Sequence, residues 1–191
     1  MNSDRTSPFT ELLNKKRIIT ADGAMGTMLY HYGVFVNTCF DQLNLTRKDL
    51  IGRIHSEYIE AGADFIETNT FGANPVRLAR FGLADKTEDI NIAGVRIAKE
   101  AAGKDVLTAG AMGPLGEPLT GKEELRKQFT EAFRVQAAAL AEGGADLIIL
   151  ETFGNIDELL LAVDSVANAA DLPIIAQLTV NEENETPFGN R

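Results

Sequence analysis

The chain has 191 residues, of which 45% are hydrophobic and 24% charged, as expected for one globular domain with a sizeable core. Its formal net charge of −10 argues against nucleic acid or an acidic membrane surface as a partner, and no apolar run is long enough to span a bilayer. The single cysteine, Cys39, excludes an internal disulfide and indicates a reducing, cytoplasmic environment.

Taken from the N-terminus, short apolar runs bounded by turn residues predict five strands, over 17–21, 65–69, 106–109, 147–150 and 174–178. Capping residues and amphipathic periodicity predict helices over 46–61, from Asn74, over 88–102, from Thr120 and from Asn155. Residues 28–48 and 181–191 are expected to form irregular connections. Because strands and helices alternate, the sheet is expected to be parallel.

One sequence pattern occurs twice, 82 residues apart. Residues 61–72 read AGADFIETNTFG, and residues 143–154 read GGADLIILETFG. Each copy predicts a helix end, a turn and a buried parallel strand, followed by a polar residue and then Thr-Phe-Gly. The two polar residues are Asn69 and Glu151. Matching polar groups at two strand tips favour an α/β barrel built by duplication, with its chemistry at that end.

A second, shorter sequence repeat supports the duplication. Residues 22–27 read DGAMGT, and residues 109–114 read AGAMGP, 87 positions later. Chance resemblance between glycine-rich turns is the alternative, and it is weaker for two echoes in matching order. A closed eight-stranded barrel needs roughly 250 residues. Five strands in this chain therefore fit either an open α/β sheet or part of a barrel.

Polar groups at the predicted strand tips are the candidate binding residues. Asp22 is followed by the small residues Gly23 and Ala24, so a carboxylate lies beside exposed main-chain N–H groups, which suits a zwitterion. A phosphate loop, which Asp22 disfavours, and a plain tight turn are the alternatives. Glu151 ends an apolar strand, so it either binds a cation or amino group with Asp22, shares acid–base work, or caps the next helix. Neutral hydrogen bonds at equivalent tips would come from Asn69, Thr70 and Thr152.

The remaining residues with metal-binding or nucleophilic side chains show no ligand spacing. Cys39 and His31 share one predicted connection, and His55 lies beside the apolar stripe of a predicted helix. Cys39 and His55 are expected to be structural.

Together, the motifs resemble the homocysteine S-methyltransferase domain family. They are ADGAMGT at 21–27, LNLT at 43–46, GAD at 62–64, TNTFGAN at 68–74, GAMGP at 110–114 and ETF at 151–153. They occur in the family's order over about residues 15 to 180. Their combination is specific, although no single motif is.

The resemblance implies a (β/α)8 TIM barrel, with residues 1–191 as its N-terminal part and about the first five β/α units. It implies a methyltransferase of methionine biosynthesis, in which a zinc-activated homocysteine thiolate takes a methyl group to give methionine. Carried over by motif, Asp22 and Glu151 would hold the homocysteine amino group. The backbone of Gly23 and Ala24, with Thr70, would position its carboxylate.

The sequence departs from the family at the metal site. The family's zinc ligands are three cysteines, after the sixth and eighth strands, and this sequence ends before all of them, so no metal ligand is assigned here. We therefore expect the chain alone to hold part of the homocysteine pocket, to be inactive, and to self-associate through unpaired barrel edges. Cobalamin or folate would act through other modules, and the methyl donor stays open.

Two other functions remain open. One is a non-catalytic α/β module that binds a small zwitterionic amino acid, which the absence of a cysteine pair favours. The other is a barrel lyase or aldolase that uses Asp22 and Glu151 with a divalent metal. Its lysine-dependent version is weakened because no lysine lies at a predicted strand tip.

Overall fold

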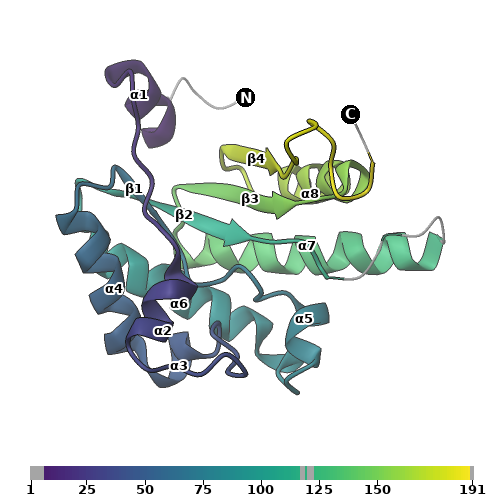
Figure 1. The fold of residues 1–191 in the computed structure, drawn as a ribbon, viewed down its shortest axis with the longest axis horizontal. Coiled ribbons are helices and arrows are strands. Elements are labelled where there is room, and N and C mark those ends of the chain that lie inside the picture. Colours follow the sequence, from purple (N-terminus) through teal and green to yellow (C-terminus); the bar gives the residue numbers. More distant parts are fainter. Residues whose placement is uncertain (1–6, 117–118, 120–122, 190–191) are drawn as a thin grey trace.

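A single parallel sheet organises the chain in the computed structural model, which describes residues 7–116, 119 and 123–189 (Figure 1). The strands are hydrogen-bonded in sequence order, β1 (Phe65–Glu67), β2 (Leu107–Met112), β3 (Leu147–Phe153) and β4 (Ile174–Leu178). Parallel neighbours require a crossover, and helices supply each one. This is the repeated β/α arrangement that the alternating pattern predicted.

The helices in chain order are α1 (Pro8–Lys15), α2 (Met25–His31), α3 (Leu43–Thr46), α4 (Lys48–Glu60), α5 (Pro75–Ala79), the 3-10 helix η1 (Ala84–Lys86), α6 (Thr87–Ala102), α7 (Glu123–Gly143) and α8 (Ile156–Ala169). Helices α4, α6 and α7 lie along one side of the sheet (Figure 1). Helix α6 contacts β1 and β2, and α8 contacts β3 and β4.

Alternation along the strands separates two apolar clusters. Ile148 and Leu150 of β3 join Phe129 and Phe133 of α7 in the main core between sheet and helices. The intervening side chains, among them Leu147, belong to a second cluster on the opposite face. That cluster contains Phe65, Ala109, Ala111, Leu147 and Ile149, with Phe9 of α1 packed against it. The second face corresponds to the interior of a barrel.

The repeated Gly-Ala-Asp turn has the same structure in both copies. Gly62 and Gly144 have φ values of 101° and 97°, in the left-handed region that favours glycine. Each turn is closed by backbone hydrogen bonds to the last residues of the helix before it. The sequence repeat is therefore a repeat of helix ends, as predicted.

The aspartate of each copy ties its strand to the chain segment beside it, which is the segment around Thr20 in the first copy and β2 in the second. Asp64 Oδ2 accepts the Thr20 N–H at 3.0 Å, and Asp146 Oδ2 accepts the Thr108 N–H at 2.8 Å. Both carboxylates also pair with a lysine, Lys16 and Lys99 respectively. The duplicated aspartates are thus structural groups at the amino ends of the strands, far from the tips.

The first predicted strand, 17–21, is not formed. Only Ala21 makes a bridge to Phe65, and Ile18 is 77% exposed. Among the described residues this segment has β1 as its one strand neighbour, so its apolar side chains gain little burial from strand geometry. The other four predicted strands are confirmed, with β3 extending to Phe153.

The predicted irregular connection over 28–48 contains helical turns, because α2 ends at His31 and α3 lies within the connection. The predicted capping box at Thr46 does not form. The Thr46 hydroxyl donates to the Gln42 carbonyl at 3.3 Å, and α4 begins after Arg47 without a side-chain cap. The caps at Asn74 and Asn155 are confirmed, whereas Thr120 lies outside the described residues.

Candidate functional site

A cavity of about 710 Å³ lies at the carboxyl ends of the strands. Six of the seven residues that the sequence singled out line it, namely Asp22, Gly23, Ala24, Asn69, Glu151 and Thr152. The cavity wall also includes Glu67, at the end of β1. Carboxyl ends of parallel strands are where α/β folds build their binding sites, so the position of this cavity is the expected one.

Three carboxyl groups meet at one end of this cavity. Asp22 Oδ2 accepts the main-chain N–H of Glu67 at 3.0 Å, and the side chains of Glu67 and Glu151 line the same cavity, near enough to influence each other's pKa. The other oxygen of Asp22, Oδ1, is buried and has no hydrogen-bond partner among the described residues. A buried carboxylate oxygen without a donor indicates a place for a ligand that carries one.

Burial is the main cause of the altered acidity of this cluster. It raises the pKa of Asp22 to about 7, against the hydrogen bond from Glu67 that lowers it. Burial, and then the charges of Glu151 and Asp22, raise the pKa of Glu67 to about 8. The pKa of Glu151 is also raised by burial. Near neutral pH the cluster therefore holds both protons and negative charge.

Sequence reasoning missed Glu67. Alternation along β1 puts it on the same face as Phe65, and alternation along β3 puts Glu151 on the same face as Leu147. An acidic residue two positions after an inward-facing phenylalanine was the available signal. The strand predicted from the sequence extended to Asn69, so Asn69, and not Glu67, was taken as the polar residue at its end.

The loop after Asp22 is held by α4. The Tyr58 hydroxyl donates to the Ala24 carbonyl at 3.3 Å. A Cβ at Gly23 would lie 2.9 Å from Tyr58 Cε1, so only glycine lets the loop pass this ring without displacement. Gly23 and Ala24 are exposed, which leaves their backbone facing the cavity opening.

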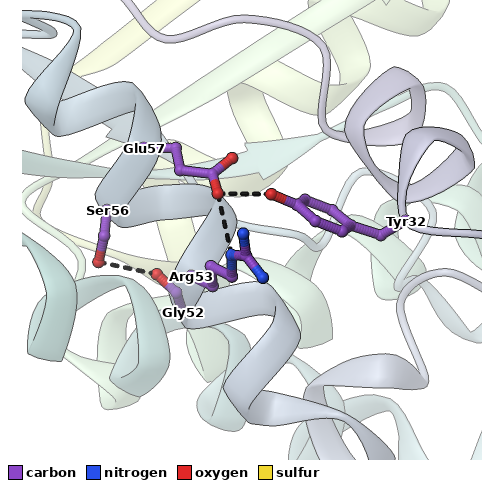
Figure 2. A network of polar contacts seen from close by, with 5 residues as sticks. All are labelled: Tyr32, Gly52, Arg53, Ser56 and Glu57. Carbon is purple, nitrogen blue, oxygen red and sulfur yellow. Dashed lines mark hydrogen bonds and ion pairs between the residues drawn. The ribbon is translucent and has the colours of Figure 1, made fainter.

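A polar network fastens the end of α2 to the same helix. Figure 2 shows the Tyr32 hydroxyl donating to Glu57, which also accepts Arg53 Nε at 3.0 Å. The Arg53 guanidinium lies over the Tyr32 ring, 4.7 Å from its centroid, while Ser56 bonds within α4 to the Gly52 carbonyl. Helix α2 begins directly after the loop at residues 22–24, so this network ties the far end of that helix to α4.

Thr70 is placed differently from the prediction. It is fully buried, does not line the cavity, and its hydroxyl donates to the Ala111 carbonyl at 2.8 Å. Thr68 Oγ1 accepts the Ala111 N–H at 3.0 Å and lies 2.6 Å from Thr70 Oγ1. The two hydroxyls extend the pairing with β2 beyond the end of β1. Thr70 thus supports the loop after β1, and its side chain does not reach the cavity.

Buried amide side chains hold the rest of that loop. Asn44 Nδ2 donates to the Asn69 carbonyl at 2.8 Å, and Asn69 Nδ2 donates to the Phe40 carbonyl and to Asn44 Oδ1. Gln136 Nε2 of α7 donates to the Thr70 carbonyl at 2.8 Å. These bonds satisfy backbone groups that would otherwise be buried without partners. Both donor groups of the Asn69 amide are therefore already engaged.

Close packing of α6 against this loop predicts a measurable cost for one added methyl group. A Cβ at Gly94 would lie 2.6 Å from both Asn44 Nδ2 and Thr70 Cγ2. We expect Gly94→Ala to lower the free energy of unfolding by about 2 kcal/mol in urea denaturation, because these buried groups must move.

The matched control is Gly52→Ala, in the middle of α4. Its Cβ would meet Ile97 Cγ2 at 3.6 Å, an ordinary contact, so the gain in helix propensity should stabilise by about 0.5–1 kcal/mol. Equal stability changes at the two glycines would contradict the packing described around Asn44.

The tip of β3 carries local backbone strain. Thr152 has a φ of 63°, which a β-branched residue rarely adopts, and the pairing of β3 with β4 shifts register between Leu150 and Phe153. Strain of this kind persists where surrounding structure enforces it and is frequent at functional sites. Glu151 and Thr152 both line the cavity at this point of the strand.

The cavity wall also includes Asp41 and Cys39, and the pKa values of both side chains are raised. Burial raises the pKa of Asp41 to about 6, although Arg77 and the Gly72 N–H, which donates to Oδ1 at 2.9 Å, lower it. Burial also raises the pKa of the Cys39 thiol, whose Sγ is 3.9 Å from Asp41 Oδ2. A thiol with a raised pKa is a poor nucleophile and metal ligand.

No group of three or more His, Cys, Asp or Glu side chains within the described residues is arranged to hold a metal ion. In the same part of the chain, none of the helices combines the length and apolar character needed to cross a bilayer.

Comparison with known proteins gives consistent matches over nearly the whole chain. A family model described as homocysteine S-methyltransferase matches residues 19–190. Methionine synthase of Mycobacterium leprae (strain TN) is 35% identical over 203 residues, and that of Mycobacterium tuberculosis (strain ATCC 25618 / H37Rv) is 34% identical over 204. Each alignment covers 95% of this chain but 17% of the relative, so the chain spans about a sixth of their length.

Solved structures show the same fold. The homocysteine methyltransferase MmuM from Escherichia coli matches with TM-scores of 0.85 in its oxidized form and 0.83 in its metallated form. The identities are 24% and 23%, and the alignments cover 97% and 95% of this chain and 70% of the MmuM chain. The predicted α/β fold class of parallel barrel units is confirmed.

Proposed function

The chain belongs to the homocysteine S-methyltransferase family, and we propose that residues 1–191 are the N-terminal part of a (β/α)8 barrel that binds homocysteine and methylates its sulfur to give methionine. One observation carries the proposal. Asp22 and Glu151 lie on one cavity wall, and Asp22 Oδ1 is buried without a donor. An α-ammonium group would supply that donor and the positive charge.

The other end of a zwitterion needs donors. We assign the homocysteine carboxylate to the main-chain N–H groups of Gly23 and Ala24, which are exposed at the cavity and carry no side-chain obstruction. Thr152, exposed beside Glu151, is a candidate for a further neutral hydrogen bond. Thr70 acts through the loop that it supports, because its hydroxyl already donates to Ala111.

Zinc does not fit the described residues. They contain no cluster of metal-ligating side chains, and Cys39 is buried with a raised thiol pKa. We therefore derive no step through zinc from this chain, and we assign no cobalamin or folate contact to it. A cytoplasmic location and self-association through the exposed edge of β4 remain proposals of the same kind.

Isothermal titration with L-homocysteine tests the assignment. We expect Glu151→Gln to weaken binding by about 10- to 100-fold at pH 7.5, because a charge-assisted hydrogen bond contributes about 1.5–3 kcal/mol. Glu142→Gln, at an exposed position on α7, is the matched control and should bind like the unaltered chain. The compound 4-mercaptobutanoate, which lacks the amino group, should not bind.

Two results would contradict the proposal. One is binding of 4-mercaptobutanoate as tight as that of L-homocysteine, and the other is unchanged affinity in Glu151→Gln. A second candidate function is a non-catalytic module for a zwitterionic amino acid, which the lack of a metal cluster among the described residues favours. Equal affinity for L-homocysteine and for amino acids without sulfur would support that alternative.

A further inference from the structure

Tyr58 of α4 holds the loop that follows Asp22 without forming part of the cavity wall. Gly23 and Ala24 line the cavity, whereas Tyr58 does not. The Tyr58 hydroxyl donates to the Ala24 carbonyl at 3.3 Å. Any effect of this side chain on a ligand in the cavity would therefore pass through the backbone of the loop.

The same side chain limits where Gly23 can lie. A Cβ on Gly23 would be 2.9 Å from Tyr58 Cε1 and 3.0 Å from the Tyr58 hydroxyl oxygen, and its three nearest neighbours would all be atoms of this side chain. The ring and the hydroxyl thus lie against two consecutive residues of the loop. Together they fix the backbone of Gly23 and Ala24 against α4.

Helix α2 strengthens this attachment at Ala24. The Ala24 carbonyl also accepts the Met28 N–H at 3.3 Å, so two donors orient one carbonyl group at the point where the loop becomes a helix. At the other end of α2, Tyr32 donates to Glu57, the residue before Tyr58. Consecutive residues of α4 therefore contact both ends of the segment 24–32.

The loop presents main-chain donors that are not used within the described residues. Neither the Gly23 N–H nor the Ala24 N–H has an acceptor there, and both residues are exposed at the cavity. Carboxylates bind well to consecutive main-chain N–H groups when the backbone already holds those groups in place. The Tyr58 hydroxyl keeps its proton at neutral pH, because burial and then the charge of Asp22 raise its pKa.

We propose, resting on the proposed homocysteine site, that Tyr58 is a positioning residue whose hydroxyl holds the Gly23 and Ala24 N–H groups in place for the substrate carboxylate. Without the hydroxyl the loop is freer to move, so ordering it on binding costs part of the binding free energy. Asp22 is held separately, because its Oδ2 accepts the Glu67 N–H at 3.0 Å. Loss of the hydroxyl therefore weakens binding of the carboxylate and leaves binding of the ammonium group unchanged.

Isothermal titration with two ligands tests this role. L-Homocysteine carries the carboxylate, and 3-aminopropane-1-thiol has the same thiol and ammonium groups without it. In Tyr58→Phe, which keeps the ring, we expect the affinity for L-homocysteine to fall by about 3- to 10-fold, the equivalent of one hydrogen bond. The affinity for 3-aminopropane-1-thiol should stay within about 1.5-fold. General damage to the fold would instead weaken the binding of both ligands alike.

Two further variants approach the same contact from the loop and from a neighbouring tyrosine. In Gly23→Ala the added methyl group meets the Tyr58 ring and displaces the loop. The affinity for L-homocysteine should then fall by about tenfold or more, and that for 3-aminopropane-1-thiol should change much less. Tyr30→Phe, at a side chain of α2 that is 50% exposed, is the matched control and should change neither affinity.

Amide NMR of the unaltered chain distinguishes the inference from the proposed function. L-Homocysteine should shift the Gly23 and Ala24 amide proton signals downfield, and 3-aminopropane-1-thiol should not. If L-homocysteine binds without shifting these signals, the carboxylate lies elsewhere and the inference is overturned. An unchanged affinity for L-homocysteine in Tyr58→Phe, or an equal loss for both ligands, would also overturn it while homocysteine binding stands. If the unaltered chain binds neither ligand, the proposed function fails and the inference fails with it.

Discussion

Replacing Phe133 by alanine is expected to lower the free energy of unfolding by about 4 kcal/mol, the largest loss we predict for a single substitution. Phe133 is fully buried on α7 and belongs to the main core between the helices and the sheet. Its ring centroid is 6.1 Å from that of Phe153, at the end of β3. Truncation leaves a cavity that neighbours on two elements border, so little collapse can relieve it.

Urea denaturation followed by circular dichroism measures this loss. Phe35→Ala is the matched control, because that side chain is 78% exposed and its removal should change stability by less than about 0.5 kcal/mol. A loss below about 1 kcal/mol in Phe133→Ala would mean that α7 and β3 are not packed as described. Because Phe153 closely follows Glu151, the variant should also weaken homocysteine binding.

Acidification below pH 6.5 is expected to remove about 3 kcal/mol of stability through His55 alone. His55 is fully buried on α4, and neither ring nitrogen has a partner among the described residues. Burial lowers its pKa from 6.5 to about 4. The unfolded chain therefore binds the proton first. The stability that neutral His55 confers is present above pH 6.5 and is lost as pH falls from 6.5 toward 4.

The acidic cluster has the opposite pH dependence. Burial raises the pKa of Asp22 to about 7 and that of Glu67 to about 8, so the folded chain binds these protons first. Their contribution to stability is present at low pH and is lost as pH rises toward 8. The two effects oppose each other over the same pH range, so the His55 contribution shows only in a comparison of variants.

Comparing variants isolates the contribution of His55 to the pH dependence of stability. Urea denaturation at several pH values between 4.5 and 7.5 should show that the stability of His55→Leu, relative to that of the unaltered chain, increases as pH falls below 6.5. His31→Leu, at the other, exposed histidine, is the matched control. If His55→Leu loses as much stability between pH 6.5 and 4.5 as the unaltered chain, His55 is not a buried neutral group.

Local patterns were sufficient for most of the fold. Strand and helix periodicity, the glycine of each repeated turn, and the caps at Asn74 and Asn155 depend on neighbouring residues, so one sequence predicts them. The same holds for Asp22 and Glu151 as polar groups at strand ends. The first strand failed because its stability depends on partners on both sides, which the sequence of 17–21 does not reveal.

Contacts between distant segments decided the rest. Asp22, Glu67 and Glu151 line one cavity because alternation in β1 and β3 and the pairing of both strands with β2 bring the three acids together. Thr70 turns away from the cavity because its hydroxyl completes the pairing with β2. The sequence could identify which residues carry charge at strand ends. Only the tertiary structure shows which of these residues lie close together and how far their pKa values are shifted. Both properties depend on burial and on contacts between segments that are far apart in the chain.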